Sequence, residues 1–128
     1  MHRHSLRFSR LPGDFSVCRL PAGSPRPVWV DGAFFCLTAT SDEVSIVCLT
    51  ELVPGEVRHE TGWTAFKLQG PFPFDLPGVL ASFLAPLAAN AIPIFALSTF
   101  DTDYVLVKEE TAERALEALR EAGHIFLD

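Results

Sequence analysis

The stretch IFALSTFDTDYVLV, residues 94–107, contains two apolar runs separated by a short polar turn. The stretch FFCLTATSDEVSIV, residues 34–47, shows the same pattern sixty residues earlier. Aromatic and β-branched residues are frequent in the apolar runs, and Thr, Ser and Asp are frequent in the turns, which is typical of β-hairpins. The two stretches therefore predict equivalent hairpins, with turns at residues 40–43 and 100–103.

Further elements are expected before each hairpin. Residues 15–20 and 63–68 predict one strand upstream of each. Between residues 63–68 and the second hairpin, apolar residues recur at the spacing of one helix face: Leu76, Val79, Leu80, Phe83, Leu84 and Leu87. We expect Asp75 to cap this helix and Pro77 to lie in its first turn, where a missing N–H costs nothing. Pro86 should bend or shorten the last turn.

A second helix is expected after the second hairpin. Thr111 is its expected cap, Gly123 ends it, and residues 124–127 form a final short strand. Its inward face is predicted to contain Ala112, Ala115, Leu116 and Leu119.

The order of these elements predicts an α+β fold. The second half reads βαββαβ, a ferredoxin-like order in which both helices cover one face of an antiparallel sheet. The first half follows the same plan with its helices reduced. We therefore expect two tandem units, a degenerate one at residues 1–61 and a complete one at residues 62–128.

Composition excludes several classes of protein. Of the 128 residues, 48% are hydrophobic, which is too many for a disordered segment. The net charge is −6, with 10 Lys and Arg against 16 Asp and Glu, so no nucleic-acid partner is expected. Three cysteines without a CxxC pair indicate reduced thiols and a cytoplasmic location.

One segment has the length of a membrane span. Residues 76–100 contain no charged side chain. Pro77, Pro86 and Pro93 interrupt this segment, and a helix, a turn and a buried strand explain it better. We therefore expect no membrane association.

Motifs for catalysis are missing from the sequence. It has no glycine-rich phosphate-binding motif, no G-x-S-x-G around a serine, and no metal-site spacing around its histidines. We therefore expect no enzymatic activity, no metal and no cofactor. Because a missing motif is weak information, a small enzyme stays open as a minor alternative.

Small and polar residues gather where the first predicted helix and the second hairpin should meet. Gly78 at the helix start would expose backbone N–H groups that suit a carboxylate. Acids on the hairpin suit an ammonium or guanidinium group. The two together would match an α-amino acid. The candidate ligand-binding residues are Asp75, Gly78, Ser98, Thr99, Phe100, Asp101 and Asp103.

Each of these residues also has a purely structural reading. Asp75 serves equally well as a helix cap, and Asp101 and Asp103 as turn residues. Gly78 would allow close helix packing, and Phe100 would fit a core. The residues alone do not decide between these readings.

Three segments together resemble the ACT-domain family. They are FFCLTAT at residues 34–40, GVLASFLAPL at residues 78–87 and LSTFDTDYVLV at residues 97–107. Small bacterial members have a degenerate ACT half followed by a complete one, and the pattern is similar to half of the CASTOR cytosolic arginine sensors. It is more distantly similar to the regulatory region of aspartate kinases. The resemblance implies a regulatory protein that pairs through its ACT units and binds an amino acid between them.

The resemblance also implies roles for individual residues. By matching positions, Gly78 and Val79 would form the helix-start side of a ligand site, and Thr99, Phe100 and Asp103 the hairpin side. A neighbouring unit would add Ser82 and Phe83. Asp103 would meet a basic side chain. Because this chain has one complete unit, a comparable site needs a homodimer, and Pro77 would remove one N–H from the helix start.

Three classes of function follow. The first is an allosteric regulator whose homodimer interface is stabilised by a basic or polar amino acid and whose signal passes to a separate protein partner. The second is a dimerisation module without a ligand, and the third is the small enzyme.

Overall fold

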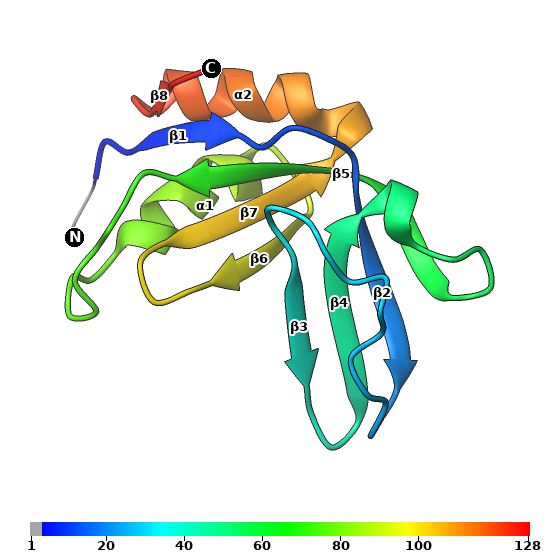
Figure 1. Ribbon diagram of the computed structural model, residues 1–128. Coiled ribbons are helices and arrows are strands. Elements are labelled where there is room, and N and C mark those ends of the chain that lie inside the picture. Colours follow the sequence, from blue (N-terminus) through cyan, green and yellow to red (C-terminus); the bar gives the residue numbers. More distant parts are fainter. Residues whose placement is uncertain (1–3) are drawn as a thin grey trace. The chain divides into compact units, whose positions relative to one another are not determined.

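A computed structural model describes residues 4–128 as two compact units. Unit 1 contains residues 4–12 and 64–128, and unit 2 contains residues 13–63. Strand β5 (Arg58–Leu68) contributes its first half to unit 2 and its second half to unit 1 (Figure 1). This division differs from the predicted boundary, because the N-terminal strand belongs with the C-terminal half of the chain.

Unit 2 is built on an antiparallel sheet with the order β3-β4-β2-β5. Its elements are β2 (Phe15–Pro21), β3 (Cys36–Ala39), β4 (Glu43–Leu49) and the 3-10 helix η1 (Thr50–Leu52). One sheet face buries a small core of Cys18, Val30, Val44, Ile46 and Cys48. Burial, with the neighbouring Cys48 thiol, raises the pKa of Cys18 to about 12, so this thiol stays protonated at neutral pH.

The hairpins β3–β4 and β6–β7 have equivalent turns, at residues 40–43 and 99–102. The N–H and hydroxyl of Thr40 donate to the carbonyl of the fourth turn residue at 2.9 and 3.3 Å. The N–H and hydroxyl of Thr99 likewise donate to the carbonyl of Thr102, at 2.8 and 3.1 Å. The predicted position of the second turn is therefore wrong by one residue, because the equivalent threonines are fifty-nine residues apart. Asp103 lies on a strand rather than in the turn.

The sheet of unit 1 has the order β6-β7-β5-β1-β8. Its elements besides β5 are β1 (Arg7–Arg10), β6 (Ile94–Ser98), β7 (Asp103–Lys108) and β8 (Ile125–Phe126). Strand β1 was not predicted, and it lies between β5 and β8. It pairs antiparallel with β5 and parallel with β8, so the predicted all-antiparallel sheet is wrong at this edge.

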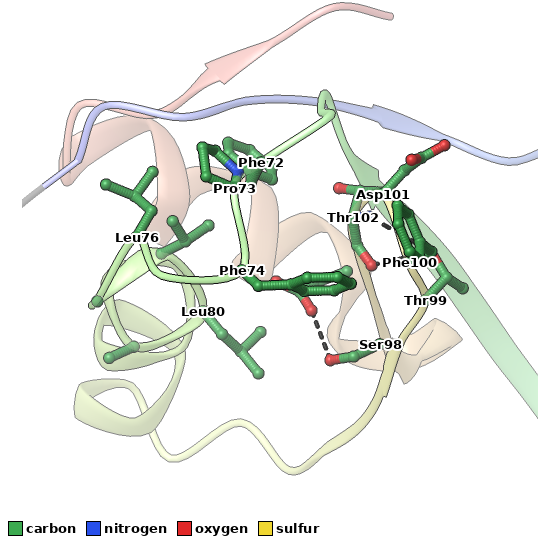
Figure 2. Close-up of a pocket in the computed structure, with 14 residues that line it drawn as sticks. Phe72, Pro73, Phe74, Leu76, Leu80, Ser98, Thr99, Phe100, Asp101 and Thr102 are labelled. Atoms are coloured by element: carbon green, nitrogen blue, oxygen red, sulfur yellow. Dashed lines mark hydrogen bonds between the residues drawn. The ribbon is translucent and has the colours of Figure 1, made fainter.

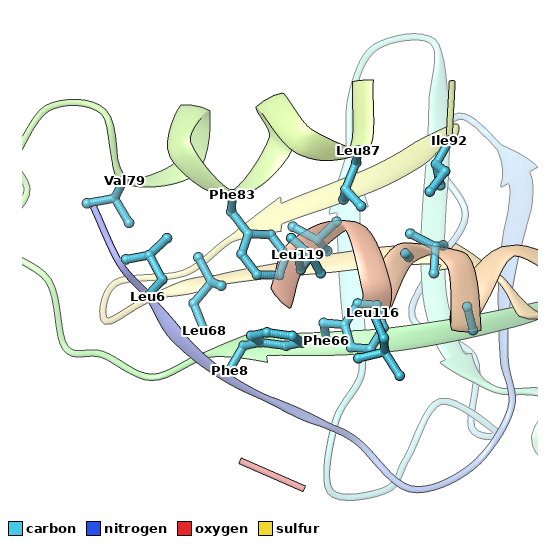
Figure 3. Close-up of a cluster of buried hydrophobic side chains, with 14 residues drawn as sticks. Leu6, Phe8, Phe66, Leu68, Val79, Phe83, Leu87, Ile92, Leu116 and Leu119 are labelled. Atoms are coloured by element: carbon cyan, nitrogen blue, oxygen red, sulfur yellow. The ribbon is translucent and has the colours of Figure 1, made fainter. Parts of the chain in front are cut away.

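Two helices cover one face of this sheet, as predicted (Figure 3). They are α1 (Val79–Ala89) and α2 (Ala112–Glu121). The apolar core between helices and sheet includes all four residues predicted for the inward face of α2. At its centre the ring of Phe8 makes edge-on contacts with Phe66 and Phe83, with centroids 5.5 and 5.2 Å apart. Neither helix is long and apolar enough to cross a membrane, and the same holds for every helix in residues 4–128.

The start of α1 differs from the prediction. The residue at the N-cap is Gly78, in the left-handed conformation with φ 83°, and within the described chain no side chain caps the helix. Asp75 is exposed and precedes it. Pro77 lies before the cap, so its missing N–H is not one of the first-turn donors. Pro86 lies inside α1 without ending it.

The helix α2 begins at the predicted residue, but the hydroxyl of that residue makes a different hydrogen bond from the one expected of a cap. Thr111 occupies the N-cap position, at the end of the 3-10 helix η2 (Glu109–Thr111). Its hydroxyl donates to the carbonyl of Lys108 at 2.8 Å instead of accepting from the helix. After α2, Gly123 adopts φ 95° and donates to the carbonyl of Arg120, which ends the helix as expected.

Candidate functional site

A groove of about 380 Å³ lies in unit 1 between the start of α1 and the β6–β7 hairpin (Figure 2). Its three sides come from the segment preceding α1, from the first turn of α1 and from the hairpin tip. The lining residues are Phe72, Pro73, Phe74, Leu76, Gly78, Val79, Leu80, Ala81, Ser98, Thr99, Phe100, Asp101, Thr102 and Asp103.

The hairpin side is held in place by hydrogen bonds. The buried hydroxyl of Thr102 donates to the carbonyl of Leu68 at 2.8 Å, which ties the turn to the end of β5. The N–H of Phe72 donates to the carbonyl of Asp101 at 2.9 Å, which ties the segment preceding α1 to the same turn. These contacts fix two sides of the groove relative to each other.

Asp103 presents its carboxylate from the first position of β7. The hydroxyl of Ser98, directly opposite on β6, donates to Oδ1 of Asp103 at 2.5 Å. This bond orients the carboxylate and leaves Oδ2 for a second donor. Asp101 is exposed at the hairpin tip, and the two acids make this side of the groove negative.

The helix side of the groove offers backbone donors. The first helical hydrogen bond of α1 runs from the N–H of Ser82 to the carbonyl of Gly78 at 2.9 Å. The N–H groups of the first turn therefore have no partner inside the helix, and no side chain caps them. Val79, Leu80 and Ala81 carry these groups and line the groove. The positive end of the helix dipole adds to their preference for an anion.

Two aromatic rings stand beside the groove in contact with solvent. Phe74 and Phe100 lie near each other in Figure 2, and their rings pack edge to face with centroids 4.8 Å apart. They are 77% and 78% exposed. Large apolar side chains this exposed are typical of binding surfaces when they occur together.

Most of the predicted site residues meet in this groove. Seven of the residues named from the sequence line it: Gly78, Val79, Ser98, Thr99, Phe100, Asp101 and Asp103. Asp75 does not line it, and neither do Ser82 and Phe83. The ring of Phe83 is fully buried in the core, and Ser82 donates its hydroxyl to the carbonyl of Gly78 at 2.7 Å.

The side of the groove formed by Phe72, Pro73 and Phe74 was not predicted. The motif FPF at residues 72–74 has neither helical nor strand periodicity, so nothing in it predicted a role. Two aromatic residues around a proline, next to a charge-free helix, are nevertheless an unusual composition for a solvent-exposed loop. Thr102 was also missed, because a polar turn residue is unremarkable until its hydroxyl is seen to be buried.

Comparison with known proteins agrees with this architecture. The family model of the ACT domain matches residues 58–121, which is half of the chain, and a second model, of an N-terminal domain, matches residues 13–56. The crystal structure of protein Atu0741 from Agobacterium tumefaciens has a TM-score of 0.91 and 42% sequence identity. The match covers 99% of this chain and 94% of that one.

More distant relatives are larger proteins. The human (Homo sapiens) cytosolic arginine sensor for mTORC1 subunit 1 is 29% identical over 107 residues, covering 77% of this chain and 32% of the sensor. The chain thus spans about a third of the length of the curated relatives it matches. An aspartate kinase from Clostridium acetobutylicum shares the fold, with a TM-score of 0.67 at 11% identity over 92% of this chain and 34% of the kinase. The domain match over half of the chain shows that the chain belongs to the ACT domain family.

Proposed function

We propose that this protein is a regulatory ACT-domain protein that binds an amino acid in the groove of unit 1. The observation that carries the proposal is the pairing of two opposite chemistries across one cavity. Uncapped N–H groups of α1 lie on one side, and the carboxylates of Asp101 and Asp103 lie on the other. An α-amino acid has a carboxylate and an ammonium group that match these two sides.

The two ends of the ligand would be held in different ways. The carboxylate would accept hydrogen bonds from the first turn of α1, for which Pro77 is no obstacle because it precedes the cap. Asp103 would accept from a cationic group through Oδ2, because Ser98 already holds Oδ1. The names of the curated relatives make L-arginine the first ligand to try.

A second protomer would complete the site. Ligand sites usually bury most of a small molecule, whereas Phe74 and Phe100 stand largely in solvent beside this groove. A homodimer that covers these rings would enclose the ligand and link ligand binding to dimer geometry. Ser82 and Phe83 of the second protomer remain proposed contributors, with Phe83 limited to its backbone because its ring is in the core.

Regulation would then work by a shift in population. A ligand that binds one dimer geometry more tightly favours that geometry by the difference in binding free energy. The changed surface would be read by a separate protein partner in the cytoplasm. No catalytic step is part of this proposal.

The alternative is a dimerisation module that binds no ligand. The exposed pair Phe74 and Phe100 favours it, since two such rings could serve protein contact alone. In that case the acids of the hairpin have only a structural role.

A thermal-shift screen against the twenty amino acids decides between the two. A ligand at one hundred times its dissociation constant stabilises the folded state by about 2.7 kcal/mol. Loss of a hydrogen bond to a charged group costs roughly 1.5–3 kcal/mol, so Asp103→Ala should reduce this stabilisation to about 1 kcal/mol or less. Asp75→Ala, an exposed acid outside the groove, is the matched control and should keep the full shift. A flat screen with the unaltered protein would reject ligand binding, and an equal shift in Asp103→Ala would reject the site.

A further inference from the structure

The N-terminal segment His4–Leu6 is bonded to the start of α1. The N–H of His4 donates to the hydroxyl of Ser82 at 3.2 Å. The ring Nε2 of His4 lies 2.9 Å from the carbonyl of Pro77, and because a carbonyl only accepts, Nε2 carries the proton. We call this segment the N-terminal strap.

A buried histidine at the other end of the chain completes the connection. His124 is 5% exposed, and its Nδ1 accepts from the N–H of Leu6 at 3.1 Å. Its Nε2 therefore carries the proton and donates to the carbonyl of Ser82 at 2.9 Å. That carbonyl would normally accept from the residue four positions later, which is Pro86 and has no N–H. His124 thus replaces the hydrogen bond that Pro86 cannot make, and in doing so joins the strap to α1.

The strap holds two peptide groups at the start of α1, one directly and one through the hydroxyl of Ser82. In a trans peptide group the C=O and the N–H point in opposite directions. His4 holds the carbonyl of Pro77, which shares a peptide group with the N–H of Gly78. The hydroxyl of Ser82 holds the carbonyl of Gly78, which shares one with the N–H of Val79. Fixing these carbonyls fixes the directions of the two N–H groups.

We infer that the strap positions the first turn of α1, through His4, Ser82 and His124, so that its N–H groups face the groove. Gly78 at the cap makes such support necessary, since a glycine with no capping side chain leaves this turn conformationally free. The consequence for ligand binding rests on the proposed function. If a carboxylate binds the same turn, ligand binding and strap docking favour each other, because coupling between two sites is reciprocal.

Hydrogen exchange in the ligand-free protein tests the positioning role. The amides of residues 82 and 83 are the first that the helix protects, so their exchange reports opening of the first turn. Removing one strap bond should speed their exchange about fivefold in His4→Ala and in Ser82→Ala. His4→Gln and Ser82→Thr restore a donor at each position and should restore slow exchange. Asn90→Ala removes a 2.8 Å bond at the opposite end of α1 and is the matched control.

The outcomes separate the inference from the proposed function. Unchanged exchange in both His4→Ala and Ser82→Ala would overturn the positioning role whether or not a ligand exists, and so would equal acceleration in Asn90→Ala. In a second arm, 10 mM L-arginine should slow exchange of the Leu6 amide at least twofold. If L-arginine does not bind the unaltered protein, arginine binding is rejected while the ligand-free comparison still decides the role of the strap.

Discussion

Replacing Gly70 by Ala should displace the hairpin tip that forms one side of the groove and destabilise the protein. A Cβ at this position would lie 2.7 Å from the carbonyl oxygen of Asp101 and 3.0 Å from Cβ of Thr102. Ordinary contacts of a Cβ begin near 3.4 Å, so residue 70 and the hairpin tip must separate by about 0.7 Å. The Asp101 oxygen belongs to the backbone and also accepts a hydrogen bond from the N–H of Phe72. It therefore cannot move aside as the end of a flexible side chain would. Overpacking of this kind typically costs 1–3 kcal/mol.

Thermal unfolding measures the effect. For a chain of this length, a loss of about 2 kcal/mol should lower Tm by roughly 5–10 °C. Gly55→Ala is the matched control, because nothing lies within 4 Å of the added Cβ and its φ is not in the left-handed region. We expect Gly70→Ala to lose any amino-acid-dependent thermal shift as well, since the displaced tip forms one side of the groove and is hydrogen-bonded to a second side through Phe72. A fall in Tm no larger than that of Gly55→Ala would refute the steric argument.

Two further substitutions test the core and a surface ion pair. Phe83→Ala removes a fully buried ring at the centre of the unit 1 core and should cost about 3–5 kcal/mol, measured by urea unfolding. A loss below 1 kcal/mol would mean that the core collapses around the gap. The hydrogen bond from the Thr64 hydroxyl, and to a smaller extent the Arg10 guanidinium, lower the pKa of Glu109 below its usual range. Because the pKa of Glu109 is lower in the folded state, its ionised carboxylate stabilises the folded protein at pH values above the unfolded pKa of about 4.3. This stabilisation disappears as the pH falls through the pKa of Glu109 in the folded state. The protein should therefore be more stable than Glu109→Gln above pH 5 and equal to it in strong acid, and a gap that persists in strong acid would contradict this reading.

The part of the fold that could be predicted is local in sequence. The apolar stripe from Val79 to Leu87 identified the buried face of α1, and the repeated pattern at residues 34–47 and 94–107 identified both hairpins. Each signal lies within one element or between neighbouring strands. The same holds for the groove, whose lining residues all lie between residues 72 and 103. This is why seven of the residues named from the sequence could be found there.

What could not be predicted depends on contacts between distant parts of the chain. Strand β1 is only four residues long, and two of these residues are arginines. The alternation of buried Leu6 and Phe8 with exposed Arg7 was the available signal. It is too short to identify a strand until β5 and β8 are in place on either side. The cap of α1 was mistaken for the same reason, because Asp75 has the chemistry of a cap and Gly78 becomes one only in the folded chain.

The compensation at Pro86 shows how distant contacts support the local site. A proline inside a helix should weaken it, and the sequence alone predicted a bend or an early end. In the folded chain His124 supplies the missing donor to the carbonyl of Ser82 from 42 residues away, and the N–H of Leu6, 118 residues from His124, holds the histidine ring in the required tautomer. The groove is therefore encoded by a continuous stretch of sequence, but the helix turn that gives it its donors is held by the two ends of the described chain. A variant altered at either end should bind less well even though every residue lining the groove is intact.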